Sequence, residues 1–225
     1  MVKHSKITKV FQLSLVIIFI LVLLGLFVPQ QFQNISSYLK NLLTTSVGWF
    51  YLLLVTGILI FCVFLIVSPI GQIRLGNPTS RPEHSTTSWI AMMFSAGMGI
   101  GLVFYGAAEP LSHFAISTPN AEIGSADALA DAFRFTFFHW GFHAWAVYAL
   151  VGLSLAYFGF RKREKYQLSV VFKPLFGKYA DGPIATIIDT ITIIATVIGV
   201  ATTLGFGASQ INGGLSYVLS LIHIS

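Results

Sequence analysis

Five long apolar runs, separated by segments rich in proline, glycine and charged residues, dominate the hydrophobic pattern of the chain. The runs cover residues 10–28, 48–70, 88–108, 135–160 and 184–206. A run of about 20 residues, at about 1.5 Å per residue, spans the ~30 Å hydrocarbon core of a bilayer as an α-helix. The pattern predicts an all-α integral membrane protein with about five transmembrane helices in a single membrane domain, residues 1–225.

The first run has a second interpretation, because Lys3, Lys6 and Lys9 precede it as in a signal peptide. Signal peptides carry an apolar core of only ~7–15 residues, followed by a cleavage site with small residues. Residues 10–28 form a longer run without such a site. A retained helix is therefore the prediction.

Composition agrees with the membrane assignment and excludes several other classes. The chain is 55% hydrophobic and only 9% charged, whereas soluble domains carry about 25% charged residues. Its one cysteine excludes a disulfide framework. The sequence has no phosphate-binding glycine loop, no metalloprotease motif and no nucleophile elbow, which argues against an enzyme.

Basic residues are distributed unevenly among the predicted loops. Of the 13 lysines and arginines, all but Lys40 and Arg134 lie in the amino-terminal segment and the second and fourth loops. The positive-inside rule places that side in the cytoplasm. We therefore expect a multi-pass protein of the cell membrane with a cytoplasmic amino terminus. Because the charges are divided among loops, they predict no nucleic-acid partner.

The third run contains three glycines at alternate positions, Gly97, Gly99 and Gly101. Glycine inside a helix costs about 1 kcal/mol relative to alanine. A broken helix at this depth is tolerated only where it is buried in protein or lines a watery cavity, as in transporters. Close packing of helices through small residues explains the same glycines, and the glycines alone do not separate the two readings.

The fourth run is the most aromatic part of the chain and includes Trp140, Trp145 and Tyr148. Helical spacing is expected to bring these three rings towards one face. Aromatic faces bind quaternary ammonium groups, although an aromatic belt at the membrane interface has the same composition. His139 and His143 are spaced to share a metal, but no carboxylate or cysteine on this run completes the set, so no transition-metal site is predicted.

Glu109 and Asp189 lie near the ends of predicted spans. An ionisable residue within a span is a functional candidate by default. Near a span end, water or a neighbouring helix can solvate it, so a structural role is an equal alternative.

Three blocks of sequence together resemble one known family. The first block runs from Gly97 to Leu102 and continues through Phe104-Tyr105-Gly106-Ala107-Ala108-Glu109-Pro110. The second includes Phe138-His139-Trp140, Trp145 and Tyr148-Ala149-Leu150, and the third includes Ile194-Ala195-Thr196, Thr203-Leu204-Gly205 and Gln210-Ile211-Asn212. Their order and spacing resemble the betaine/carnitine/choline transporter family.

The resemblance implies a fold and a substrate site. Members have twelve helices, with an inverted-repeat core of five plus five that holds the substrate at mid-membrane, as in LeuT-like transporters. The chain resembles the first five helices. Trp140, Trp145 and Tyr148 match the cage around a trimethylammonium group, and Gly97, Met98, Gly99, Ile100 and Gly101 match the interrupted helix beside it. The family also implies a possible homotrimer.

For the coupling ion, the resemblance implies sodium or a proton and no other cofactor. The carbonyls of Ser95 and Met98 match one sodium site of the family, and Thr196 matches a threonine ligand of another. The second threonine of that pair is replaced here by Val200, which offers no oxygen. The choice between sodium and a proton therefore stays open.

The expected function is uptake of glycine betaine, choline, carnitine or a similar quaternary ammonium compound, driven by an ion gradient. A membrane-embedded assembly subunit and an ion channel are the alternatives. We expect these 225 residues to transport nothing by themselves, because the family needs both repeats. Residues 219–225 resemble a translated sequencing adapter, so the native sequence is expected to end near Val218 and the gene to encode about seven more helices.

Overall fold

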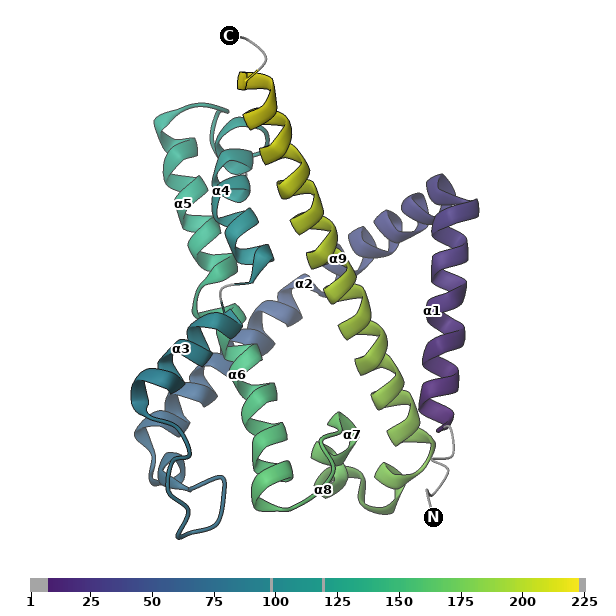
Figure 1. Ribbon diagram of the computed structural model, residues 1–225, viewed down its shortest axis with the longest axis vertical. Coiled ribbons are helices and arrows are strands. Elements are labelled where there is room, and N and C mark those ends of the chain that lie inside the picture. Colours follow the sequence, from purple (N-terminus) through teal and green to yellow (C-terminus); the bar gives the residue numbers. More distant parts are fainter. Residues whose placement is uncertain (1–7, 98, 119, 223–225) are drawn as a thin grey trace. The chain divides into compact units, whose positions relative to one another are not determined.

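The computed structural model describes residues 8–97, 99–118 and 120–222, and every regular element within these ranges is helical (Figure 1). The long helices are α1 (Lys9–Phe27), α2 (Pro29–Val67), α3 (Thr86–Gly97), α4 (Ile100–Ala115), α5 (Ala126–Trp140), α6 (Phe142–Ala156) and α9 (Pro183–Ile222). The short ones are η1 (Pro69–Gln72), η2 (Tyr157–Arg161), α7 (Leu168–Val171), α8 (Lys173–Phe176) and η3 (Gly177–Asp181). The predicted all-α fold is confirmed.

Four helical stretches among the described residues are long and apolar enough to cross a membrane. They are Lys9–Phe27, Pro29–Val67, Ala126–Arg161 and Pro183–Ser220. Each contains most or all of one predicted span. The remaining predicted span, 88–108, is divided between α3 and α4, of 12 and 16 residues. The protein is therefore an all-helical membrane protein whose third span is interrupted.

The segment between the first two predicted spans is helical, although hydropathy placed a loop there. Helix α2 begins at Pro29 and runs for 39 residues. Proline suits the first turn of a helix, because the N–H that it lacks would be unpaired there anyway. At about 1.5 Å per residue, this helix is about twice as long as the hydrocarbon core is thick. Hydropathy detects the lipid-buried part of a helix and misses its polar extension.

Helix α9 likewise extends beyond its predicted span, because it continues from residue 206 to Ile222. Residues 219–222 belong to this helix, and residues 223–225 lie outside the described residues. The adapter origin of residues 219–225 stays a prediction.

The chain divides into two compact units. The first comprises Met1–Pro78 and Ala146–Val197. Within it, the Asp189 carboxylate of α9 accepts hydrogen bonds from Ser169 N at 3.0 Å and Ser169 Oγ at 2.9 Å. Both residues are buried, so this contact fastens the loop helix α7 to α9. On the same unit, Arg161 Nη1 donates to the Arg74 carbonyl at 2.7 Å.

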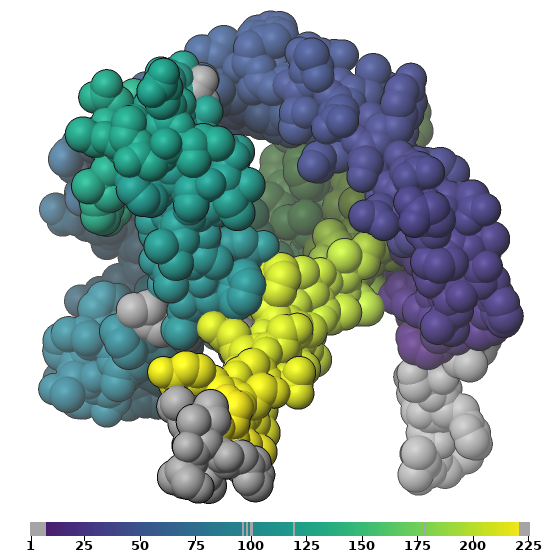
Figure 2. All heavy atoms as spheres, turned by 90° about the horizontal axis from the view of Figure 1, so that it is seen from above, coloured from purple at the N-terminus to yellow at the C-terminus, as the bar shows by residue number. Residues whose placement is uncertain are grey.

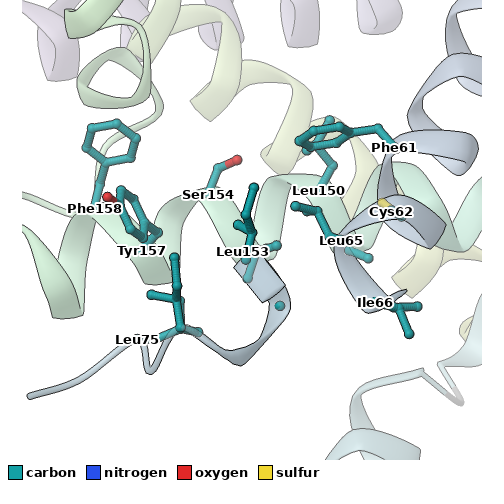
Figure 3. Close-up of a pocket in the computed structure, with 14 residues that line it drawn as sticks. Phe61, Cys62, Leu65, Ile66, Leu75, Leu150, Leu153, Ser154, Tyr157 and Phe158 are labelled. Carbon is teal, nitrogen blue, oxygen red and sulfur yellow. The ribbon is translucent and has the colours of Figure 1, made fainter. Parts of the chain in front are cut away.

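An apolar cavity of about 550 Å³ lies in this first unit, where α2 and η1 meet α6 and η2 (Figure 3). Its labelled walls include Phe61, Leu65, Leu150 and Leu153, and no charged side chain lines it. None of the predicted site residues lies in its wall.

The second unit comprises Thr79–Trp145 and Ile198–Ser225. Helices α4 and α5 lie side by side within it (Figures 1 and 2). Ala128 and Ala132 of α5 are buried, since small residues let two helices approach closely. The Ser125 hydroxyl caps α5 by accepting from Ala128 N at 3.1 Å. This helix pair carries Ile100, Gly101 and Trp140 of the predicted substrate site.

Candidate functional site

The third span is interrupted where its glycines predicted an interruption. Helix α3 ends at Gly97, and Gly99 has an extended backbone (φ −77°, ψ 168°) before α4 begins at Ile100. The Gly99 carbonyl then accepts from Leu102 N at 3.1 Å and starts α4. A helix that ends in this way leaves the carbonyls of its last turn, including that of Ser95, without helical partners.

Helix α4 does not stop at the Glu109–Pro110 pair, where the sequence placed the end of the span. It continues through Pro110 to Ala115. The proline removes one hydrogen bond without ending the helix, as membrane helices tolerate. Glu109 and His113 consequently share one face, with Glu109 Oε1 at 3.3 Å from His113 Nε2.

The fourth span is also divided, because α5 ends at Trp140 and α6 begins at Phe142. Gly141 between them has φ −91° and ψ −149°. A Cβ at this position would lie 2.3 Å from the Phe137 carbonyl oxygen, so the backbone conformation requires glycine. The sequence predicted that Trp140 and Trp145 lie on one face of a single continuous helix. That prediction is wrong, because the two tryptophans lie on different helices.

Two contacts of Trp145 arise from these interruptions. Its indole N–H donates to the Trp140 carbonyl at 3.1 Å, an acceptor at the end of α5. A Cβ added to Gly97 would lie 2.9 Å from Trp145 Cη2, so the indole packs directly against the glycine at the end of α3. The structure thus brings Gly97, Trp140 and Trp145 together.

Trp140 is held by Glu109 and by an aromatic neighbour. Its indole N–H donates to Glu109 Oε2 at 2.5 Å, and its ring stacks on Tyr105 with 5.5 Å between centroids. Tyr105 in turn meets Phe206 of α9 edge-on at 5.3 Å. Glu109 Oε1 also contacts His139 Nδ1. The carboxylate therefore links α4 to the last turn of α5.

Sequence reasoning missed Tyr105, Phe206 and His113 as neighbours of the tryptophans. The signal for His113 was its spacing of four residues from Glu109, which puts both side chains on one helical face. Tyr105 and Phe206 carried no comparable signal, because aromatic residues are frequent along the whole chain, with 20 phenylalanines.

Other predicted site residues lie on α6, α9 and α4. Tyr148 lies on α6 and Thr196 on α9, and both belong to the first compact unit. The Thr196 hydroxyl donates to the Thr192 carbonyl at 2.8 Å, the usual bond of a threonine in a membrane helix. Met98 lies outside the described residues. Gly101 lies within the first turn of α4, with nothing within 4 Å of an added Cβ.

The indole N–H groups of Trp140 and Trp145 both have acceptors within the protein. Because tryptophan has only this one polar hydrogen, the two rings can offer a ligand their π surface and no hydrogen bond. Such surfaces suit a cation without N–H groups.

These features define an all-helical membrane protein with interrupted helices and a cluster of aromatic side chains beside them. Comparison with known proteins gives its family. The model of the betaine/carnitine/choline family transporters matches residues 9–224. The chain therefore belongs to the betaine/carnitine/choline transporter family.

Individual relatives agree with this assignment. The chain is 52% identical to the glycine betaine transporter OpuD of Bacillus subtilis (strain 168), over 98% of this chain and 43% of that protein. It is 44% identical to a glycine betaine transporter of Acinetobacter baylyi, over 93% of this chain and 32% of the relative. It is 43% identical to an ectoine/hydroxyectoine transporter of Virgibacillus pantothenticus, over 94% of this chain and 42% of that protein. The chain thus spans less than half the length of these relatives.

Proposed function

We propose that this chain forms part of a secondary transporter for glycine betaine or a related quaternary ammonium compound. One observation carries the substrate class: the indole N–H groups of Trp140 and Trp145 both donate to protein acceptors. A trimethylammonium group cannot donate or accept an ordinary hydrogen bond, so a π surface with its polar hydrogen engaged is a matched partner. The names of the relatives support the same class.

The interrupted third span supports transport rather than static binding. Half-helix ends expose carbonyls that coordinate ions beside the substrate in transporters. Ser95 lies in the last turn of α3, so its carbonyl is a candidate ligand for the coupling ion, together with Thr196. Val200 offers no oxygen at the other expected position. Sodium and a proton both remain coupling ions in this proposal.

Placement in the cell membrane with a cytoplasmic amino terminus follows from the distribution of lysine and arginine. On this orientation, the loop that carries α7, α8 and η3 faces the cytoplasm, and the turn between α4 and α5 faces outward. A homotrimer completes the proposal on family resemblance.

Uptake of radiolabelled glycine betaine tests the proposal. The intact transporter that carries this sequence is expressed in cells without their own betaine uptake, and a sodium or a proton gradient is imposed in turn. We expect accumulation that collapses when the driving gradient is removed. An ion current without accumulation would favour the channel, and neither signal in a correctly inserted protein would favour the assembly subunit.

A matched pair of variants ties uptake to the site. Trp145→Leu removes a predicted cage ring, whereas Trp89→Leu removes an exposed tryptophan near the start of α3. We expect a higher Michaelis constant for betaine in Trp145→Leu and an unchanged one in Trp89→Leu. Equal constants in both variants and the parent would remove the aromatic site from the proposal.

A further inference from the structure

Glu109, His113 and His139 form a cluster whose donor atoms all lie within 4.8 Å of one another. We infer that this cluster binds a divalent transition-metal ion, with Zn²⁺ as the ion that fits best. The inference is independent of the proposed transport, because it concerns metal binding by side chains within one compact unit.

The spacing of the donors suits such an ion. Zn²⁺ binds histidine nitrogen and carboxylate oxygen at about 2.0–2.2 Å, so neighbouring donors in a tetrahedral site lie roughly 3.3 Å apart. His113 Nε2 and Glu109 Oε1 are 3.3 Å apart, and His139 Nδ1 contacts the same oxygen. The His139 side chain is 48% exposed, so its ring can turn to widen that contact.

The two ring nitrogens of His113 face two oxygen atoms. Nδ1 lies 3.4 Å from the Ser117 carbonyl oxygen, and Nε2 lies 3.3 Å from Glu109 Oε1. A neutral imidazole carries one hydrogen, on either nitrogen. In the tautomer with the hydrogen on Nδ1, Nε2 presents its lone pair towards the carboxylate, which is the arrangement that a metal ion between these two atoms would use.

The surrounding contacts are those that orient metal ligands. A metal-bound histidine usually donates its second ring N–H to a carbonyl or carboxylate, and a ligating carboxylate is itself hydrogen-bonded. His113 has that contact to Ser117, and Glu109 Oε2 accepts from Trp140 Nε1 at 2.5 Å. The second carboxylate oxygen is thereby engaged, and Oε1 is left as the ligand that faces both imidazoles.

The cluster could not be found on one helix. The sequence pairs His139 with His143 on the fourth span and supplies no carboxylate there. The structure instead brings Glu109 and His113 to His139 from α4, because α4 continues through Pro110. Two imidazoles and one carboxylate are a donor set that Zn²⁺ uses, with its fourth position open to water. The cluster lies near the end of α4, before the turn that is expected to face outward.

The test is metal binding by the full chain in detergent or nanodiscs. Co²⁺ serves as the spectroscopic probe, and Zn²⁺ displaces it to give the dissociation constant. We expect one site with the absorption of a tetrahedral or five-coordinate ion. Glu109→Gln, His113→Ala and His139→Ala should each weaken binding by at least ~100-fold, since even second-shell changes cost about 10–100-fold.

His84→Ala is the matched control, because His84 is an exposed histidine in the loop before α3. Its metal affinity should equal that of the parent. If the cluster variants and the control all keep the parental affinity, the metal is adventitious and the inference is wrong. If the parent binds no metal, the inference is equally wrong.

A measurement on the unaltered chain covers the case in which a variant does not fold. Diethyl pyrocarbonate modifies histidine nitrogens that carry a free lone pair, and mass spectrometry locates the product. We expect Zn²⁺ to protect His113 and His139 while His84 reacts at its unprotected rate. Equal reaction at all three histidines with and without Zn²⁺ would contradict the site.

Discussion

Helices α1 and α2 differ from helices α3 to α5 in their continuity. Helices α1 and α2 each run without interruption, for 19 and 39 residues. The second region is interrupted at Gly99 and ends at Gly141. The contacts of Trp140 and Trp145 lie beside these two interruptions, because a break releases backbone acceptors and lets a side chain approach the backbone.

Glycines show the same difference at the level of single atoms. A Cβ at Gly48 or Gly57 of α2 meets nothing within 4 Å, whereas one at Gly97 or Gly141 meets an atom at 2.9 or 2.3 Å. A Cβ added to Gly99 meets nothing within 4 Å, and the extended backbone of Gly99 suits any residue. Glycine in a span therefore indicates a site only where the space beside it is filled.

The largest effect is expected for Gly141→Ala. The new Cβ would overlap the Phe137 carbonyl, which belongs to the backbone and cannot rotate away, so the turn between α5 and α6 must shift. Overpacking of this kind costs about 1–3 kcal/mol or more. We expect a clear fall in the thermal unfolding midpoint, together with loss of uptake. Size-exclusion chromatography of heated samples measures the midpoint.

Gly57→Ala is the control for this substitution. It lies within α2, where alanine is favoured over glycine by about 1 kcal/mol, and the site is open. Its midpoint should stay equal or rise. A fall of similar size in both variants would mean that continuity of the helix does not distinguish the two regions.

The sequence predicts the helical class and the interruption of the third span, because apolar length and glycine content are local properties. It does not predict the helical continuation through Pro110, the polar start of α2 or the second interruption at Gly141. These depend on whether neighbouring contacts offset the loss of one hydrogen bond. The meeting of Glu109 with Trp140 is likewise tertiary, since the two residues lie 31 positions apart.

Asp189 tests whether polar residues of the first unit serve stability rather than binding. Asp189→Ala leaves the buried N–H and hydroxyl of Ser169 without their carboxylate acceptor, which costs about 1–3 kcal/mol. Ser169→Ala removes only the hydroxyl bond and should cost about 0.5–1.5 kcal/mol. We expect lower thermal midpoints for both, with the betaine Michaelis constant unchanged, and a changed constant would contradict the structural role.

Trp145 tests the opposite property, affinity without stability. Trp145→Leu should weaken betaine binding by roughly two- to thirty-fold, the range of a cation–π contact of ~0.5–2 kcal/mol. The same range is expected for Trp140→Leu and Tyr148→Leu. Direct binding of radiolabelled betaine to the purified intact transporter measures it, and parental affinity in all three variants would favour the aromatic belt.

Gly97→Ala sharpens this result, because its Cβ would displace the Trp145 ring without removing it. We expect weaker betaine binding than in the parent. The double variant Gly97→Ala with Trp145→Leu should bind no more weakly than Trp145→Leu, since residues in contact do not act additively. Fully additive losses would mean that Gly97 acts through something other than Trp145.

The smallest effect is expected for Lys173, the first residue of α8, in the segment between α7 and α9. Its ammonium lies 3.3 Å from both Glu164 Oε2 and Asp181 Oδ1, and the hydrogen bonds, first to Glu164 and then to Asp181, raise the pKa of Lys173. A lysine whose pKa is raised in the folded state stabilises the protein fully at a pH below its unfolded-state pKa of about 10.4. This stabilisation is lost as the pH rises through the folded-state pKa. Exposed ion pairs are screened by water and salt, so Lys173→Met should leave the thermal midpoint at pH 7 nearly unchanged. Any small deficit of the variant should be constant through neutral pH and vanish only in alkaline solution, and a large deficit at pH 7 would show that this loop contributes to stability through Lys173.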